Sequence, residues 1–372
     1  MTFCIVTHVP HLQTPDGRWW AYAPYVREMN LWNQTFNKVI VVAPVNIGTP
    51  TPLHETYAHP NVELHEVPQI SFVSVKSIFR SLFRLPFILR AMRQAFQQSD
   101  QLHLRCPGNM GLLGMWGQLG YSAKPKTIKY AGNWIDNQGQ PWSYRFQKWM
   151  MKQPWLLKNT KVLAYTFQQV NAAHVLPFFT ATYREDEIPN ASFQRDRSVI
   201  QLLFVGTLSA GKRPEWVIET AAELYNKGIS VQLNIVGEGV LRSELESMAS
   251  HFDPEGQWIH FLGAVDRESL KSIYKKSHFL LAPSKSEGWP KVVAEALFWG
   301  CIPVVTPVSC LPEMIGQGQR GLFFDKPTQV AEALVTLLRE PIQMEKMSHV
   351  GQEWAQHYTL NRFEQAIQKV LS

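Results

Sequence analysis

The sequence predicts an α/β protein with two doubly wound parallel-sheet domains. From about residue 200 to 325, short apolar runs alternate with helical patterns of 10 to 14 residues, the order that right-handed βαβ units require. The chain has 372 residues, of which 45% are hydrophobic and 18% charged, so it can fill two cores. We therefore expect Rossmann-like domains at 1–190 and 198–355. A polar, irregular linker is expected at 181–197, and a C-terminal helix at 356–372.

In the first half, apolar runs without polar alternation are typical of strands buried on both faces of a parallel sheet. Strands are expected at 3–7, 38–43, 62–67, 100–105, 127–130 and 161–165, and helices at 22–32, 72–96 and 142–157. A loop to about Arg18 should follow the first strand. It is long for such a connection, which favours a functional loop. Pro86 should break or kink the helix at 72–96.

In the second half, strands are expected at 202–205, 231–236, 258–262, 278–282, 301–305 and 322–324. Helices are expected at 214–227, 240–250, 266–276, 290–300, 330–338, 344–357 and 362–371. Asp266 is the predicted cap of its helix, and Gly228 the predicted stop of an earlier one. Pro290 suits a first helical turn, where its missing N–H would have no partner in any case.

Composition limits the function classes. The formal net charge is +6 and the pI about 9.0, a mild bias compatible with an anionic small-molecule substrate or an anionic membrane surface. No basic stripe accompanies a nucleic-acid-binding module. The cysteines lack metal-like spacing, so buried reduced thiols are expected at Cys4, Cys106, Cys301 and Cys310. No signal peptide and no uninterrupted 18-residue apolar run are found, so we expect a cytoplasmic protein, soluble or peripheral at the inner face of a membrane.

The stretch from Ser286 to Ala296 carries the strongest functional signal. Glu287 should lie in a strand-to-helix loop and Glu295 about a turn and a half into the helix. The free N–H groups at a helix N-terminus bind phosphate. Carboxylates beside it repel phosphate but accept hydrogen bonds from sugar hydroxyls, often two from a vicinal diol. Phosphate donors and diol acceptors together suit a sugar nucleotide.

This Glu-x7-Glu pattern, with Gly-Trp-Pro-Lys after the first Glu, resembles the donor-site motif of glycosyltransferase family 4. These are retaining enzymes of the GT-B fold, in which two Rossmann-like domains face a cleft. The last helix of GT-B proteins crosses back to the first domain, and the resemblance implies the same for 356–372. The resemblance implies that Glu287 contacts the transferred sugar and acts in catalysis, and that Glu295 holds the ribose. It implies further donor contacts, some through backbone N–H groups on the diphosphate, at Gly288, Trp289, Pro290 and Lys291.

The loop from Gly206 to Arg213 resembles the family's diphosphate loop in part. Family members usually carry Arg just after this Gly and Lys five residues later. Lys212 matches, whereas Thr207 stands in place of the Arg, and Arg213 is the candidate for the missing cation. Cations there would stabilise the charge that grows on a leaving diphosphate. The resemblance also implies that the base pocket is lined by backbone atoms of Gly237, Gly239 and the segment 261–265, which ends at Val265.

Acceptor-side residues are expected in the first half. The family often has a Gly-rich loop after the first strand, where this chain has only Gly17, beside Arg18. Arg105 ends a strand, where ligands collect in open α/β sheets. The His that many family members carry after the strand at 127–130 is absent, and the position holds Gly132 or Asn133. By loop position, the replacements considered are Asn133, Trp134 and Asp136, with Asn133 assigned to catalysis.

The helix at 72–96 is basic and amphipathic. Its cations through Arg84 fall about four residues apart and so share a face. Such a helix can lie on an anionic membrane, but a core-packed helix with solvated cations is the favoured interpretation. The basic residues are Lys76, Arg80, Arg84, Arg90 and Arg93.

The predicted function is transfer of a sugar, with retention of configuration, from a nucleoside-diphosphate sugar to a saccharide or lipid-linked acceptor in glycan or polysaccharide biosynthesis. No metal or other cofactor is expected, because loop cations and a helix terminus take the role of a metal. One alternative is a nucleotide-sugar-binding protein with weakened catalysis, which the absent Arg and His support. Another is a GT-B epimerase or phosphorylase.

Overall fold

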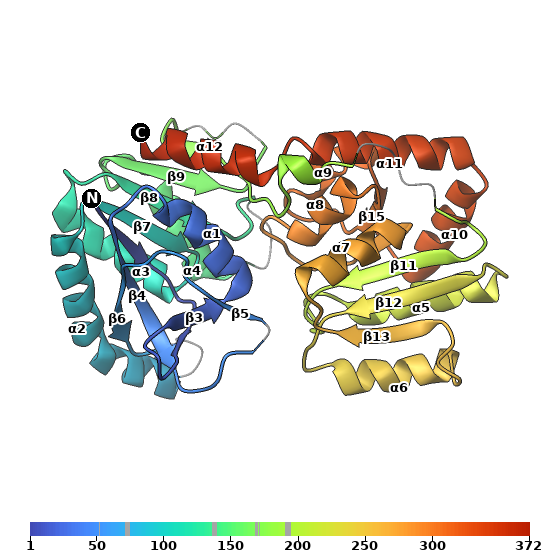
Figure 1. The fold of residues 1–372 in the computed structure, drawn as a ribbon, viewed down its shortest axis with the longest axis horizontal. Helices are drawn as coiled ribbons and strands as arrows, with labels where there is room; N and C mark the ends of the chain where they lie inside the picture. Colours follow the sequence, from blue (N-terminus) through green and yellow to red (C-terminus); the bar gives the residue numbers. More distant parts are fainter. Residues whose placement is uncertain (52, 71–74, 136–139, 168–169, 171, 190–194) are drawn as a thin grey trace. The chain divides into compact units, whose positions relative to one another are not determined.

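The computed structural model describes residues 1–372 except 52, 71–74, 136–139, 168–169, 171 and 190–194. The chain divides into two compact units (Figure 1). The first comprises Met1–Phe178 with Glu364–Ser372, and the second Phe179–Phe363. The segment expected as a linker is thus grouped with the second unit, and it contains a short 3-10 turn, η2 (Glu185–Glu187).

The first unit is built on one sheet whose main part is parallel, in the order β6-β4-β1-β7-β8-β9-β10. A small extension beyond β4 contains β2, β3 and β5, of which β3 pairs antiparallel with both neighbours. The strands are β1 (Thr2–Val6), β2 (His11–Gln13), β3 (Trp19–Tyr22), β4 (Lys38–Asn46), β5 (His54–Thr56), β6 (Val62–Val67), β7 (Gln101–Cys106), β8 (Lys126–Tyr130), β9 (Thr160–Ala164) and β10 (Val175–Pro177).

Handedness decides which face of this sheet each helix covers. The connections β6–α2–β7, β7–α3–β8 and β8–α4–β9 run in one direction across the sheet, so right-handed crossovers put α2, α3 and α4 on the same face. The connection β1–α1–β4 runs the other way, which puts α1 on the opposite face. The helices are α1 (Ala23–Asn33), α2 (Val75–Gln98), α3 (Asn109–Gly117), followed by the 3-10 turn η1 (Gln118–Tyr121), and α4 (Trp142–Met151).

Two predictions for the first half are wrong. The segment expected as a loop to about Arg18 contains β2, and β3 follows it from Trp19, because Gly17 (φ +80°) closes a tight hairpin in which the Gly17 N–H donates to the Thr14 carbonyl. Pro86, expected to break or kink its helix, does not break it, since α2 continues through it. The helix at 142–157 stops at Met151, three residues before Pro154. The other elements expected in the first half lie within a few residues of their expected bounds, whereas β5, α3 and β10 were not expected.

The second unit contains a fully parallel six-stranded sheet in the order β13-β12-β11-β14-β15-β16. In chain order this is 3-2-1-4-5-6, the doubly wound order of dinucleotide-binding folds. The strands are β11 (Ile200–Val205), β12 (Val231–Val236), β13 (Ile259–Gly263), β14 (Phe279–Ala282), β15 (Ile302–Val305) and β16 (Leu322–Phe323). The fold class predicted from the sequence, two Rossmann-like parallel-sheet domains, is confirmed.

Helices α5 and α6 lie on one face of this second sheet and α7 and α8 on the other, because their connections run in opposite directions from β11. The helices are α5 (Pro214–Asn226), α6 (Arg242–Phe252), α7 (Arg267–Lys276), α8 (Lys291–Phe298), α9 (Leu311–Met314), α10 (Pro327–Leu338) and α11 (Pro341–Ala355), with the turn η3 (Gly316–Gly318). The last helix, α12 (Leu360–Leu371), begins in the second unit and continues in the first. Asp266 caps α7 as predicted, accepting from the N–H groups of Glu268 and Ser269. Pro290 occupies the cap position of α8 rather than its first turn.

Each sheet has its own apolar core. In the first unit β1, β4 and β7 pack against α2 and α3 around Leu102, Leu104 and Phe96. In the second, β11 and β12 pack against α5 and α10 around Leu202, Leu233 and Leu334. Among the described residues, no helix combines the length and apolarity needed to cross a bilayer.

Candidate active site

Two loops of the second unit begin at the carboxyl ends of the neighbouring strands β11 and β14 and lead to opposite faces of the sheet. β11 pairs with β12 on one side and with β14 on the other. The loop after β11 leads to α5, and the loop after β14 leads to α8 on the opposite face of the sheet. In a doubly wound sheet, ligands bind in the crevice that forms where the strand order reverses in this way.

Lys212 and Glu287 meet at this point. The Lys212 ammonium lies 2.5 Å from Oε1 of Glu287, and both side chains are partly buried. The two loops are also joined by backbone, since the Lys285 N–H donates to the Gly211 carbonyl over 2.9 Å. The Glu287 N–H donates to Oγ of Ser309 over 3.2 Å. The structure therefore brings together the two residues assigned from sequence to the sugar and the diphosphate.

The glycines after β12 fit a close approach of backbone to backbone. A Cβ on Gly237 (φ +137°) would lie 1.9 Å from the carbonyl oxygen of Gly206, and one on Gly239 would lie 2.3 Å from that of Leu208. The loops after β11 and β12 are joined by a hydrogen bond from the Leu208 N–H to the Glu238 carbonyl (3.0 Å), and the Gly237 N–H donates to the carbonyl of Gly263, the last residue of β13 (2.8 Å). These glycines therefore build an interlocked rim along the carboxyl edge of the sheet.

Glu295 lies on α8 with its carboxylate buried. Oε1 accepts from the Thr182 hydroxyl (2.7 Å) and Oε2 from the Tyr274 hydroxyl (3.0 Å). Burial raises the pKa of Tyr274 well above its usual value, and the neighbouring carboxylate adds to the rise, so Tyr274 stays a donor. Each carboxylate oxygen has a second acceptor position. A diol bound at Glu295 would therefore share the carboxylate with the Thr182 and Tyr274 hydroxyls.

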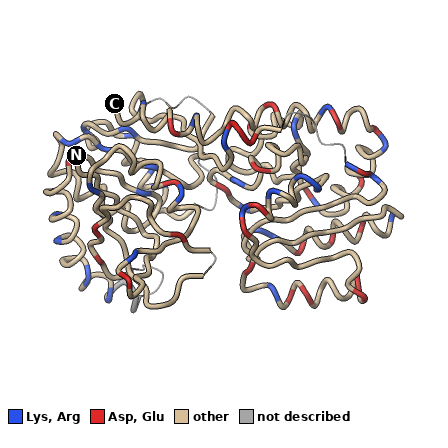
Figure 2. Tube along the Cα trace, viewed as in Figure 1, with Lys and Arg blue, Asp and Glu red and all other residues tan. Residues whose placement is uncertain are grey.

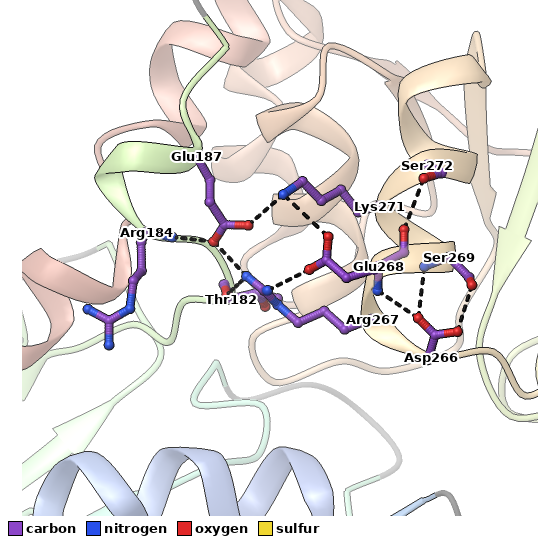
Figure 3. Close-up of polar contacts among 9 residues, drawn as sticks. All are labelled: Thr182, Arg184, Glu187, Asp266, Arg267, Glu268, Ser269, Lys271 and Ser272. Atoms are coloured by element: carbon purple, nitrogen blue, oxygen red, sulfur yellow. Dashed lines mark hydrogen bonds and ion pairs between the residues drawn. The ribbon is translucent and has the colours of Figure 1, made fainter.

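The segment that carries Thr182 is tied to the start of α7 (Figure 3). The Glu187 carboxylate pairs with Arg267 (2.6 Å) and Lys271 (2.8 Å), and the Arg267 guanidinium also donates to the Thr182 carbonyl (3.2 Å). Burial raises the pKa of Glu187, but hydrogen bonds from Lys271, the Arg184 N–H and Arg267 outweigh it and lower the pKa overall. This ion-pair cluster fixes the position of Thr182 relative to α7.

The remaining donor-side predictions have separate surroundings. Thr207 is exposed. The Arg213 guanidinium lies over the Trp216 ring, 4.4 Å from its centroid. Trp289 is buried against Phe179. Three others are found as follows: Gly288 accepts from Cys310 at its carbonyl, Lys291 opens α8, and Val265 is half-buried just before the α7 cap.

In the first unit, Arg105 belongs to a buried ionic cluster. Its guanidinium lies 2.6 Å from Oε1 of Glu28, and the Lys129 ammonium lies 2.8 Å from the same oxygen. Arg105 is also stacked over the Tyr25 ring. Sequence reasoning missed Glu28 and Lys129, although a charged residue inside an apolar strand such as β8 signals a buried partner.

The other acceptor-side predictions fall on two loops. The Asn133 side chain accepts from the Ile135 N–H, and Trp134 is buried against Tyr130. Asp136 lies outside the described residues. Gly17 sits in the β2–β3 turn, where Arg18 pairs with Asp16 over 2.6 Å.

Comparison with known proteins identifies the class of the second unit. Residues 186–354 match the sequence model of the family described as glycosyl transferases group 1. These residues are similar to that family, and the resemblance found from the Glu-x7-Glu motif is confirmed for them.

Two characterised relatives carry the comparison further. The chain is 31% identical over 143 residues to a GDP-mannose-dependent alpha-(1-6)-phosphatidylinositol dimannoside mannosyltransferase of Mycobacterium tuberculosis, covering 38% of this chain and 36% of that protein. It is 27% identical over 155 residues to the alpha-D-kanosaminyltransferase of Streptomyces kanamyceticus, covering 41% and 39%. The chain thus spans little more than a third of the length of these relatives.

Solved structures extend the fold comparison to the whole chain. Anabaena Alr3699/HepE, in complex with UDP and glucose, superposes with a TM-score of 0.70 at 13% identity and covers 100% of this chain and 99% of that one. Sucrose-phosphate synthase from Thermosynechococcus elongatus gives a TM-score of 0.66 at 15% identity, covering 100% and 98%. The chain has the GT-B fold.

Proposed function

We propose that this protein is a retaining glycosyltransferase that moves a sugar from a nucleoside-diphosphate sugar to a saccharide or lipid-linked acceptor in glycan or polysaccharide biosynthesis. The Lys212–Glu287 pair at the carboxyl ends of β11 and β14 carries this proposal. It sets one cation and one hydroxyl acceptor side by side, where doubly wound sheets bind nucleotides.

The chemistry of the site follows from these two groups. As the glycosidic bond breaks, negative charge grows on the diphosphate, and the Lys212 ammonium together with the N–H groups at the start of α8 stabilises it. Glu287 accepts hydrogen bonds from the transferred sugar, and Glu295 from the ribose. When the donor binds, phosphate oxygens replace Glu287 as the partner of Lys212, which frees the carboxylate for sugar hydroxyls.

Relatives support a nucleotide-sugar donor. The mycobacterial relative is named for its use of GDP-mannose, and the Anabaena neighbour was solved with UDP and with UDP-glucose. We propose that the reaction needs no metal or other cofactor, because Lys212 and the α8 terminus supply the positive charge that a metal supplies elsewhere.

The test is turnover by the purified protein with a panel of UDP-, GDP- and ADP-sugars, in buffer with and without EDTA. We expect donor hydrolysis or transfer with one panel member, unchanged by EDTA, and a product whose anomeric configuration by NMR matches the donor. An inverted product would refute retention, and loss of activity in EDTA would refute metal independence.

The same assay separates the alternatives. Donor binding without turnover in every condition would favour the binding protein, and turnover that requires inorganic phosphate would favour a phosphorylase. The Glu287→Gln variant should lose at least ~10²-fold in kcat, the scale of one transition-state contact. Unchanged turnover would reject the assignment of Glu287.

We also propose peripheral membrane contact through residues 72–96, of which 72–74 lie outside the described residues; such contact suits a lipid-linked acceptor. Phe79, Phe83 and Phe87 recur every four residues on α2 and are exposed, Phe83 to 85%. Ile88 and Met92 face the core instead. These exposed rings support the membrane interpretation over the favoured sequence interpretation of a helix whose outer face is merely solvated.

A further inference from the structure

Charge is distributed unevenly along the chain. Residues 67–178 contain 14 Lys and Arg but two acidic residues, Asp100 and Asp136, a net of +12 where the whole chain has +6. Figure 2 shows Lys and Arg along α2, at the left of the view, without acidic residues between them. The α2 sequence itself contains five cations and no acid. Lys126, Lys129 and Lys148 are buried. The exposed cations Arg80, Arg90, Arg93 and Arg145 lie on α2 and α4, so these two helices present an electropositive surface.

A second aromatic element lies on the same face of the sheet as α2. On α4, Trp142 is 77% exposed, and the exposed ring of Trp149 stacks on Phe146 with a centroid distance of 5.7 Å. A surface groove of about 410 Å³ runs along the helix and is lined by Trp142, Arg145, Phe146, Lys148, Trp149 and Lys152. The opposite side of α4, with Met150 and Met151, is buried in the core.

The helix between them continues the pattern. α3 and η1 lie between α2 and α4 in sheet order and expose Trp116 and Leu119. The sequence of α3 and η1 contains no charged residue. Exposed rings thus extend over all three helices, which we call the α2–α4 face.

We propose that the α2–α4 face docks on an anionic lipid bilayer, with Trp142 and Trp149 of α4 as a second anchor beside the α2 phenylalanines. The inference rests on the membrane contact that forms part of the proposed function, and it adds the residues that set the orientation of the first unit. Indole rings favour the boundary between headgroups and acyl chains, where one end is apolar and the other wet. Arg145 and Lys152 flank them, where long cationic side chains reach anionic headgroups.

Charge and apolarity together favour lipid over other polyanions. Nucleic acid would satisfy the cations but offers no apolar phase for exposed Phe, Trp and Leu side chains. A protein partner would need a dense set of acidic residues on its own surface, because the α2–α4 face carries many cations and almost no acids. A bilayer with acidic headgroups supplies both the charge and the apolar interior.

The test measures flotation of the full chain with vesicles of phosphatidylcholine, with and without 30% phosphatidylglycerol, in the absence of any sugar donor. Wild-type protein should bind the anionic vesicles and not the neutral ones. The Trp142→Ser/Trp149→Ser variant should bind at least ~10-fold more weakly, and Arg145→Ser about fivefold more weakly, the equivalent of one surface charge. Val240→Ser/Ile342→Ser, which changes exposed apolar residues of the second unit, is the matched control and should bind as wild type.

The outcomes are distinguishable. Equal binding by the tryptophan variant, binding to neutral vesicles alone, or no binding to either kind of vesicle would overturn the proposal. If the serine variant has lost its cooperative thermal transition, Trp142→Phe/Trp149→Phe takes its place. The readout is then quenching of tryptophan fluorescence by brominated lipid, which must be weaker in this variant than in wild type if the indoles insert. Turnover with a water-soluble acceptor should be unchanged in the tryptophan variants. A failure of the membrane-docking proposal therefore does not affect the proposed glycosyl transfer, and a failure of glycosyl transfer does not affect the docking proposal.

Discussion

Replacing Lys212 with methionine should affect stability and catalysis to different degrees. The Lys212 side chain is 31% exposed and that of Glu287 12%, which puts the pair between exposed pairs, worth about 0–1 kcal/mol, and buried pairs, whose disruption costs about 3–5 kcal/mol. We therefore expect a loss of about 1–2 kcal/mol in the free energy of unfolding. Loss of the diphosphate contact should lower kcat by about 10²–10³-fold.

The two quantities are measured by urea unfolding and by initial rates with the preferred donor. Lys285→Met is the matched control, because Lys285 is an exposed lysine of the loop after β14 and its loss should change stability by no more than about 0.5 kcal/mol. Combining Lys212→Met with Glu287→Gln should give a coupling of about 1 kcal/mol in stability. A rate within threefold of wild type, beside the expected loss of stability, would show that the pair is structural and refute the diphosphate assignment.

Three further predictions follow from contacts described above. Thr182→Val removes a hydroxyl that would compete with the donor's ribose for the Glu295 carboxylate. The donor's dissociation constant, measured by calorimetry, should therefore fall about fivefold, which corresponds to about one hydrogen bond. Weaker binding would show instead that Thr182 supports the site. Gly237→Ala forces a Cβ against the Gly206 carbonyl at a positive φ and should lower the free energy of unfolding in urea by at least ~2 kcal/mol. Gly211→Ala, whose added Cβ would have nothing within 4 Å, should be near neutral. Equal effects of the two substitutions would contradict the close-approach argument. Burial lowers the pKa of His11 from 6.5 to about 4, so the unfolded chain takes up the proton first and stability should fall as pH drops from 6.5 to 4; in His11→Gln this part of the slope should disappear, and an unchanged slope would assign it to other groups.

The sequence predicted the second unit closely because its signals are local. The apolar run at Val231–Val236 matches β12 at both ends, and Asp266 caps α7 through its own side chain. The hairpin around Gly17 was missed since β2 and β3 have three and four residues, too short for a periodic pattern.

At the candidate site, the loops could be predicted but the pairing could not. Lys212 and Glu287 are 75 positions apart, and only the strand order brings them together. The hydroxyls on Glu295 come from Thr182 and Tyr274, on a separate segment and on α7. No periodicity or spacing in the sequence encodes such contacts, because they depend on which connections cross which face of the sheet.

The interlocked glycine rim limits how this candidate site can diverge. Because main-chain atoms of the loops after β11 and β12 and of the end of β13 are hydrogen-bonded to one another, lengthening the loop after β11 or β12 would disturb the neighbouring loops. A homologue that prefers another base or sugar is therefore expected to keep these loop lengths and to change the side chains that project from them, at Thr207, Arg213 and Val265. Loop length along this edge should vary less between homologues than side-chain identity does.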